Sequence, residues 1–190
     1  MKICFATNNA HKLQEVKALL DQGIDLQSLS DIRCAQTLPE NQKTLEGNSL
    51  EKAEYVYDHY GVNCFADDTG LEVYALDGAP GVFSARYASS GNSLDNINLL
   101  LKNLEDQTNR RAQFRTVITL IIEGKRKQFE GIVKGKILEK MEGEEGFGYD
   151  PIFVPGGHEL TFAQMDFKMK NSISHRGQAI KKLVKYLNEL

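Results

Sequence analysis

Two long segments in the second half of the chain constrain its fold most. Residues 112–122 and 127–138 are rich in β-branched and aromatic side chains, and only Glu123-Gly124-Lys125-Arg126 separates them. Two strand-forming segments joined by a short loop that contains glycine form an antiparallel hairpin. We therefore expect a β-sheet that contains this hairpin.

The remaining segments alternate between strand and helix patterns. Residues 2–6 read as a strand, and apolar residues then recur at helical spacing from Leu13 to Leu20, before a stop at Gly23. Further strands are expected at 64–66, 71–76 and 152–154, a turn at 78–81, and further helices at about 44–60, 93–104 and 174–190. The alternation predicts the α/β fold class. A length of 190 residues predicts a single domain over 1–190, with room for two lobes.

Composition excludes several classes of function. The formal net charge is -3, whereas a nucleic-acid surface usually needs clustered basic residues. No apolar run approaches the roughly 18 residues of a membrane span, and the chain starts directly with a strand pattern. We expect a soluble cytoplasmic protein with no nucleic-acid or membrane partner. The odd number of cysteines argues against a disulfide framework, and Cys4 and Cys64 are expected to be small buried hydrophobic residues.

The run Asp67-Asp68-Thr69-Gly70 follows the short apolar segment Cys64-Phe65-Ala66. In open α/β sheets ligands bind just beyond the carboxyl ends of strands, so two carboxylates there could hold a divalent cation or activate a water. The alternative is an acidic turn, in which aspartate and glycine serve turn geometry alone. Taken by itself, the run favours the turn.

Basic residues occupy the first turns of two predicted helices. His11 and Lys12 begin one, and His175 and Arg176 begin the other, where the helix dipole disfavours positive charge by a few tenths to about 1 kcal/mol each. A cation beside the free N–H groups of a helix N-terminus is a natural receptor for phosphate. The alternative is exposed side chains whose penalty is screened by solvent. The segment Thr7-Asn8-Asn9 comes just before His11. Its backbone amides could surround an anion, or it could serve as an ordinary helix cap.

Two further patterns each allow a functional and a structural interpretation. Thr44, Asn48 and Lys52 recur every four residues on one helix face, which could direct Lys52 toward a phosphate. A solvated face explains the same spacing and is favoured. The string Phe147-Gly148-Tyr149-Asp150-Pro151 could stack on a planar ring whose edge Asp150 reads, or could be a turn with two aromatic residues in the core.

Five motifs occur in a characteristic order along the chain. They are Ala6-Thr7-Asn8-Asn9 with Lys12, Asp67-Asp68-Thr69-Gly70-Leu71, Gly78-Ala79-Pro80-Gly81 with Ser84-Ala85-Arg86-Tyr87, Phe147-Gly148-Tyr149-Asp150-Pro151, and Ser174-His175-Arg176-Gly177. In this order the chain resembles the family of non-canonical purine nucleoside triphosphate pyrophosphatases, from the first strand to the final helix. The resemblance implies Mg²⁺-dependent hydrolysis of ITP, dITP and XTP to the monophosphate and pyrophosphate. It also implies an elongated mixed β-sheet flanked by helices, with two lobes and a central substrate cleft, and a homodimer.

The resemblance further implies roles for individual residues. Asp68 would bind metal and act as the base for water, and Glu40 would be a second metal ligand. The triphosphate and sugar would be held by Thr7, Asn8, Asn9, Ala10, His11, Lys12, Lys52, Thr69 and Lys170. The base would be held by Phe147, Gly148, Tyr149, Asp150, His175 and Arg176.

Three positions depart from the family pattern. Asn8 stands where glycine is usual, so the sequence does not determine the backbone conformation of the loop. Asparagine is the best substitute for glycine where φ is positive. Thr69 replaces the more frequent serine and keeps the hydroxyl. Gly47 stands where an acid is common, so no acidic role is expected at that position.

The residues leave two other functions open. One is a nucleotide phosphohydrolase that prefers a different altered base or releases orthophosphate. The other is a non-catalytic nucleotide-binding module. The joint presence of Asp68, Lys52 and Arg176 argues against this module, because binding alone needs no water-activating acid. The role of Asp67 is also open, since it could bind metal, orient Asp68 or shape the turn.

Overall fold

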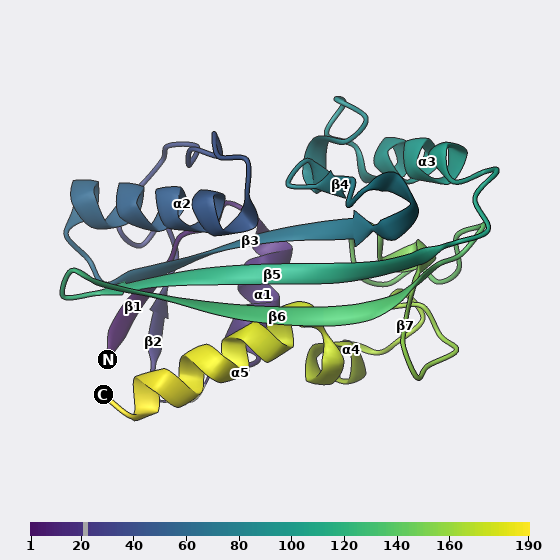
Figure 1. Cartoon of the computed structure of the whole chain (residues 1–190). Helices are drawn as coiled ribbons and strands as arrows, with labels where there is room; N and C mark the ends of the chain where they lie inside the picture. Colours follow the sequence, from purple (N-terminus) through teal and green to yellow (C-terminus); the bar gives the residue numbers. More distant parts are fainter. Residues whose placement is uncertain (21–22) are drawn as a thin grey trace. The chain divides into compact units, whose positions relative to one another are not determined.

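A seven-stranded sheet flanked by helices forms the frame of the computed structural model, which describes residues 1–20 and 23–190 (Figure 1). The strand order is β2-β1-β3-β5-β6-β7, and β4 pairs with β3. β1 pairs in parallel with β2 and β3, whereas the pairs β3–β4 and β6–β7 are antiparallel. The expected mixed α/β sheet is therefore confirmed. The elements are β1 Lys2–Phe5, α1 Ala10–Lys17, β2 Asp25–Gln27, α2 Leu45–Tyr60, β3 Cys64–Val73, β4 Pro80–Gly81, α3 Ser93–Asn103, β5 Arg111–Ile122, β6 Lys125–Ile137, β7 Phe153–Pro155, α4 Phe167–Ile173 and α5 His175–Asn188.

The chain divides into two compact units. The first unit comprises Met1–Asp68, Thr116–Gly131 and Arg176–Leu190, and the second comprises Thr69–Arg115 and Ile132–His175. Each unit has a hydrophobic core of its own. In the second unit, for example, α3 contributes Leu100 to a core that contains Phe114 and Phe153.

In the first unit the sheet is covered on both faces. Phe5 of β1 and Phe65 of β3 stack with ring centroids 4.7 Å apart, on the face packed against α1 and α5. Cys4 and Cys64 pair in register one residue earlier and pack with α2. Helix α2 lies on the opposite side of the sheet from α5 (Figure 1). Because side chains alternate between faces along a strand, neighbouring residues of β3 belong to different helix layers. Both cysteines are fully buried, as expected, and burial raises the pKa of each thiol to about 12.

The expected hairpin is confirmed as β5 and β6, which are neighbours in the sheet. Its loop is shorter than the four residues expected, because only Glu123 and Gly124 lie outside the strands. Both have positive φ, 49° and 77°. A two-residue loop of this kind matches the twist of antiparallel strands.

The predicted end of a strand at Ala66 is wrong. β3 continues without interruption from Cys64 to Val73, so Asp67 and Asp68 lie in the middle of a strand instead of at its carboxyl end or in a turn. The turn prediction failed because both acids have partners on other elements. These charged and polar side chains compensate for the cost of burying the two carboxylates. Gly70 serves close packing instead of turn geometry, because a Cβ there would stand 2.6 Å from the carbonyl oxygen of Gly81 in β4.

Local signals located the helices well. Thr44 caps α2 by accepting a hydrogen bond from the Gly47 amide at 3.0 Å, and Gly61 ends it with φ of 64°. The first helix ends at Lys17 instead of reaching Leu20, and the rest of its predicted run toward Gly23 includes residues 21–22, which lie outside the described residues.

Three short elements, β2, β4 and α4, were not predicted from the sequence, and β4 takes up the second half of the turn expected at 78–81. Three, two and seven residues are too few to establish a period of two or of 3.6. The segment predicted as a strand at 71–76 is divided between the end of β3 and a 3₁₀ turn, Tyr74–Leu76. Over the described residues, no helix combines the length and apolar character that crossing a membrane requires.

Replacing Gly70 with alanine should destabilise the fold by about 1–3 kcal/mol, because the new Cβ would overlap the Gly81 carbonyl. The urea midpoint should fall while the denaturant slope stays constant. Gly23→Ala is the matched control, because a Cβ at Gly23 meets no atom within 4 Å. Equal midpoints for the two variants would contradict the close approach of β4 to β3.

Candidate active site

Asp67 and Asp68 are consecutive residues of β3, and their side chains lie on opposite faces of the sheet. Asp67 shares its face with Phe65 and contacts α1 and α5, whereas Asp68 shares its face with Ala66 and contacts α2. This follows from the two-residue period of a strand. The two acids therefore belong to separate groups of residues.

The Asp67 group is a buried cluster of four charged side chains. Lys12 Nζ lies 2.9 Å from Asp67 Oδ1, and Arg176 Nε lies 3.1 Å from Asp67 Oδ2. Arg176 also donates through Nη1 to Glu15. Burial disfavours the charged form of Asp67, but Lys12 and Arg176 outweigh it and hold the pKa of Asp67 well below its ordinary value. The same carboxylates raise the pKa of Arg176 against the effect of burial.

The Asp68 group combines two carboxylates, an amide and an ammonium. Asn48 Nδ2 donates to Asp68 Oδ2 at 3.0 Å, and Lys52 Nζ lies 3.5 Å from Asp68 Oδ1. The same ammonium lies 2.6 Å from Glu40 Oε1. Burial raises the pKa of Asp68 above its ordinary value, although Lys52 works in the opposite direction. Burial also acts to lower the pKa of Lys52, but the nearby carboxylates of Asp68, Asp67 and Glu40 outweigh it and raise that pKa.

The favoured interpretation of the Thr44, Asn48 and Lys52 ridge as a solvated face is wrong for Asn48 and Lys52, whereas Thr44 is exposed. Asn48 is 0% exposed and Lys52 is 5% exposed, because the chain before α2 and the middle of β3 cover them. Polar residues at helical spacing can be buried when a neighbouring strand supplies charged partners. Lys52 contacts Glu40 and Asp68 in the structure, and its expected role toward a substrate phosphate stays a prediction.

The pair Glu40 and Asp68 suits a hard divalent cation. Their carboxylate oxygens contact the same ammonium, so both can approach one small cation at that place. Mg²⁺ is commonly held by one or two carboxylates, with waters and substrate phosphates completing its shell. Within the described part of the chain, no group of three or more His, Cys, Asp or Glu residues could form a complete protein cage for a metal. The donor set thus fits a metal that also binds the substrate.

The loop before α1 caps that helix through the Asn9 side chain. Asn9 Oδ1 accepts hydrogen bonds from the amides of His11 at 2.9 Å and Lys12 at 3.2 Å, and the Asn9 amide donates to Thr7 Oγ1. The backbone amides of Asn9, His11 and Lys12 therefore already donate hydrogen bonds to side-chain oxygens within the loop. Asn8 does not adopt positive φ, so the usual glycine is not required by the backbone here.

In the second unit, Asp150 and Lys170 form a buried ion pair. Their Oδ2 and Nζ atoms lie 2.7 Å apart, and Asp150 also accepts the amide hydrogen of Phe147 at 2.8 Å. Lys170 Nζ lies 4.8 Å from the centroid of the Phe147 ring. Lys170, which the resemblance grouped with the phosphate ligands, therefore lies among the residues expected to hold the base.

Tyr149 and His175 are also buried in the second unit. The Tyr149 hydroxyl donates to the carbonyl of Ser84 at 2.9 Å, and its ring is part of the hydrophobic core, as the alternative interpretation of this string predicted. Phe147 is only half-buried. The His175 ring stacks on Phe114, with centroids 4.6 Å apart and planes 14° apart. The interpretation of the basic residues at helix starts as exposed side chains is therefore wrong for His175 and Arg176, while His11 is exposed.

The other predicted residues take varied positions. Thr69 and Gly148 are half-buried, and Ala10 begins α1 at the surface. Glu15 was missed by the sequence analysis. Its signal was available, because Lys12 and Glu15 lie three residues apart and therefore share one face of α1.

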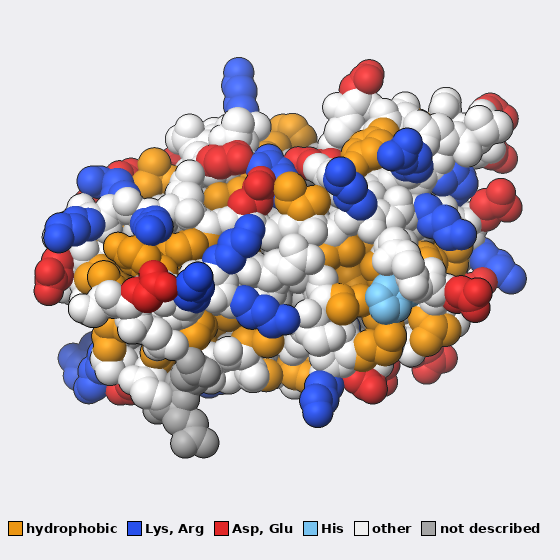
Figure 2. Space-filling view, turned by 60° about the horizontal axis from the view of Figure 1, so that its bottom comes forward, with side chains coloured by type: hydrophobic (Ala, Val, Ile, Leu, Met, Phe, Trp, Pro, Cys, Tyr) orange, Lys and Arg blue, Asp and Glu red, His pale blue; other side chains and the backbone are white. Residues whose placement is uncertain are grey.

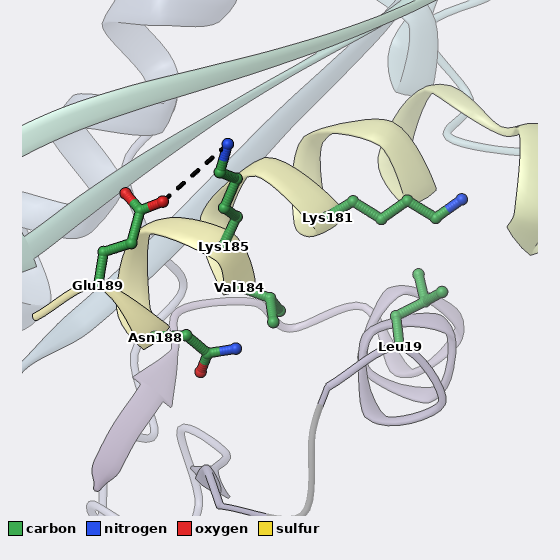
Figure 3. Close-up of a pocket in the computed structure, with 6 residues that line it drawn as sticks. All are labelled: Leu19, Lys181, Val184, Lys185, Asn188 and Glu189. Carbon is green, nitrogen blue, oxygen red and sulfur yellow. Dashed lines mark ion pairs between the residues drawn. The ribbon is translucent and has the colours of Figure 1, made fainter.

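A hollow of about 450 Å³ lies between α5 and the chain after α1, and it is lined by Leu19, Lys181, Val184, Lys185, Asn188 and Glu189 (Figure 3). Its main ion pair, Lys185 to Glu189, is 4.0 Å long and exposed. Over the face shown in Figure 2, basic and acidic side chains are interspersed.

Comparison with known proteins gives one consistent result. The model of the Ham1 family matches residues 3–186. The protein named dITP/XTP pyrophosphatase in Flavobacterium johnsoniae is 52% identical over 188 residues, covering 98% of each chain. The protein of that name in Porphyromonas gingivalis is 49% identical, covering 98% of this chain and 97% of its own. The Ham1 protein structure from Staphylococcus aureus has a TM-score of 0.91 at 37% identity, covering 100% of this chain and 99% of that one.

Replacing Asp67 with asparagine should lower the free energy of unfolding by about 3–5 kcal/mol, because Lys12 and Arg176 lose a buried counter-charge. Urea unfolding measures the loss. Glu54→Gln is the control, since its ion pair with Arg126 is exposed and should contribute less than about 1 kcal/mol.

The effect of Asp67 on stability should also depend on pH. Because its folded pKa is depressed, the contribution is fully present above the unfolded pKa of about 4 and is lost as the pH falls through the folded value. The stability difference between wild type and Asp67→Asn should stay constant from about pH 5 to 8 and narrow in stronger acid. A difference that widens in acid would contradict this assignment.

Proposed function

The chain belongs to the Ham1 family, and we propose that it hydrolyses non-canonical purine nucleoside triphosphates such as dITP, XTP and ITP to the monophosphate and pyrophosphate. The observation that carries this proposal is the Asp68 group, in which a carboxylate of raised pKa lies beside Lys52 and Glu40. The printed names of the relatives support the substrate class. Full coverage of both chains supports transfer of the whole activity.

Asp68 is the proposed general base. Water attacks the α-phosphorus, one of its protons passes to a carboxylate oxygen of Asp68, and the bond from the α-phosphorus to the oxygen that bridges to the β-phosphorus breaks. The products are the nucleoside monophosphate and pyrophosphate. A raised pKa makes the carboxylate a better proton acceptor near neutral pH than an ordinary aspartate.

Glu40 and Asp68 are the proposed ligands of Mg²⁺. When bound, the cation supplies positive charge against the phosphates and makes water easier to deprotonate. Lys52 is available to neutralise charge on the leaving pyrophosphate, since its raised pKa keeps it protonated. The ammonium of Lys12, held by Asp67, is proposed for a similar role together with the polar loop before it.

The base is assigned to Phe147, Asp150, Lys170 and His175, with Arg176. Buried, ion-paired polar groups are suited to distinguishing six-oxo purines from adenine. A buried donor that pairs with the six-oxo group is left unpaired when adenine presents its amino group there, and this lowers the affinity for adenine. Asp67 and Glu15 fix the guanidinium of Arg176 in one orientation. This kind of fixed donor is suited to reading a base edge.

The resemblance also implies a homodimer located in the cytoplasm. Both stay proposals, supported by the family assignment alone. Equilibrium sedimentation of the purified chain tests the dimer.

Rates of pyrophosphate release from ITP, XTP, dITP, GTP and ATP with Mg²⁺ test the proposed function. The six-oxo substrates without a two-amino group should exceed ATP in kcat/KM by about 100-fold or more. Release of orthophosphate, or faster hydrolysis of dUTP than of ITP in a parallel assay, would favour a different nucleotide phosphohydrolase. Tight ITP binding without turnover would favour a non-catalytic module.

Asp68→Asn should reduce pyrophosphate release by at least about 100-fold, because the proton acceptor and a metal ligand are lost. Circular dichroism should report an unchanged fold. Asp58→Asn makes the same chemical change at an exposed position of α2 and should retain wild-type rates. An undiminished rate in Asp68→Asn would remove Asp68 from the proposed role.

His175→Ala should mainly loosen base selectivity, so that the ratio of kcat/KM for ITP to that for GTP falls. The ratio is the informative quantity because His175 also packs on Phe114, and any unfolded fraction affects both substrates equally. An unchanged ratio would contradict a role in reading the base.

A further inference from the structure

We propose that Asn48 and Glu51 of α2 are positioning residues that fix Glu40 in place relative to Asp68. The inference rests on the proposed function, in which these two carboxylates hold the divalent cation. Glu40 lies in the chain before α2 and its side chain is 35% exposed. A ligand in such a segment needs other contacts to keep it at a defined distance from its partner.

Asn48 connects both ligands through one side chain. Its Oδ1 accepts the backbone N–H of Gln42 at 2.9 Å, two residues after Glu40, and its Nδ2 donates to Asp68 Oδ2 at 3.0 Å. The Asn48 side chain is 0% exposed, so its hydrogen bond to Asp68 is buried away from competing water, whereas the one from Gln42 is partly buried. The contact also occupies one oxygen of Asp68, while the other oxygen is the one near Lys52.

Glu51 holds the same segment from one turn further along the helix. Its Oε2 accepts the backbone N–H of Asn41, the residue directly after Glu40, at 2.8 Å. Its Oε1 accepts the side-chain amides of Asn41 at 3.0 Å and Gln42 at 3.4 Å. The carboxylate is therefore directed at the backbone beside a proposed ligand.

Gly47 shows how closely residues 40–42 pack on α2. A Cβ at Gly47 would stand 2.7 Å from the Cβ of Gln42 and 3.1 Å from the hydroxyl oxygen of Thr44. A larger side chain at this position would therefore displace the segment. Here Glu51 and Asn48 provide the polar contacts that hold it.

The test compares Glu51→Ala with Glu54→Ala, which makes the same change on the same helix at an exposed pair with Arg126. Two quantities are measured: the binding of Mn²⁺ alone, from the free-ion electron paramagnetic resonance signal, and the Mg²⁺ concentration that gives half-maximal pyrophosphate release. Glu51→Ala should weaken both by about 10-fold, whereas kcat at saturating Mg²⁺ and the KM for ITP change little. Glu54→Ala should match wild type.

Three further variants separate positioning from general stability. Glu51→Gln keeps an acceptor oxygen for the Asn41 amide and should recover most of the lost metal affinity. Gly47→Ala pushes Gln42 away without removing a hydrogen bond and should also weaken metal binding. Asn48→Ala should weaken metal binding and also lower kcat, because Asp68 loses its fixed orientation. The thermal midpoint is recorded for each variant.

Glu51→Ala with metal affinity equal to that of Glu54→Ala would overturn the proposal, and so would a lowered thermal midpoint without a change in metal affinity. Wild type could turn over ITP without binding Mn²⁺ in the absence of substrate. The Mg²⁺ concentration for half-maximal pyrophosphate release in Glu51→Ala and Glu54→Ala would then decide whether Glu51 positions the ligands. If wild type released no pyrophosphate from any of the five nucleotides, the proposed function would fail, and Mn²⁺ binding alone would decide whether Asn48 and Glu51 position the ligands.

Discussion

Adjacent side chains of a β-strand point to opposite faces of the sheet, and this constraint separates the two consecutive aspartates of β3. Asp67 enters the layer formed by α1 and α5, where Lys12 and Arg176 bind it. Asp68 enters the layer formed by α2, where Asn48 and Lys52 contact it. A shift of one residue in the register of β3 would exchange the two environments. The pairing of β1 with β3 therefore fixes which aspartate meets Glu40 and which meets Arg176.

The two environments differ in charge as well as in position. Among the contacts described, Lys12 and Arg176 balance Asp67 and Glu15, so the cluster under α1 and α5 is formally neutral and can remain buried. Under α2, one ammonium faces two carboxylates, Glu40 and Asp68. This second group has an excess of negative charge and is partly open through Glu40. This imbalance supports the proposal that a cation binds beside Asp68 and Glu40.

The sequence predicted the elements whose patterns are long or punctuated, including the hairpin, α2 with its cap at Thr44 and its stop at Gly61, and the final helix. Through the family resemblance it also paired Asp68 with Glu40, whose carboxylates contact the same ammonium in the structure. It failed where burial reversed a local rule. Two adjacent acids followed by glycine have the composition of a turn, and only the partners on other elements make them part of a strand. Asn48 and Lys52 likewise have the spacing of a solvated face, and no local signal reveals that the preceding segment covers them.

The cysteines of the first unit have a consequence for redox chemistry. Cys4 and Cys64 lie fully buried beside each other on neighbouring strands, and burial raises the pKa of both thiols to about 12. Because oxidants and alkylating reagents react with the thiolate, these residues remain protonated and inert at neutral pH. Oxidation of the folded chain should therefore affect exposed sulfur first, at methionines such as Met141 and Met169. The strand that carries the candidate active site is thus protected from a common route of chemical damage by the same packing that holds it in register.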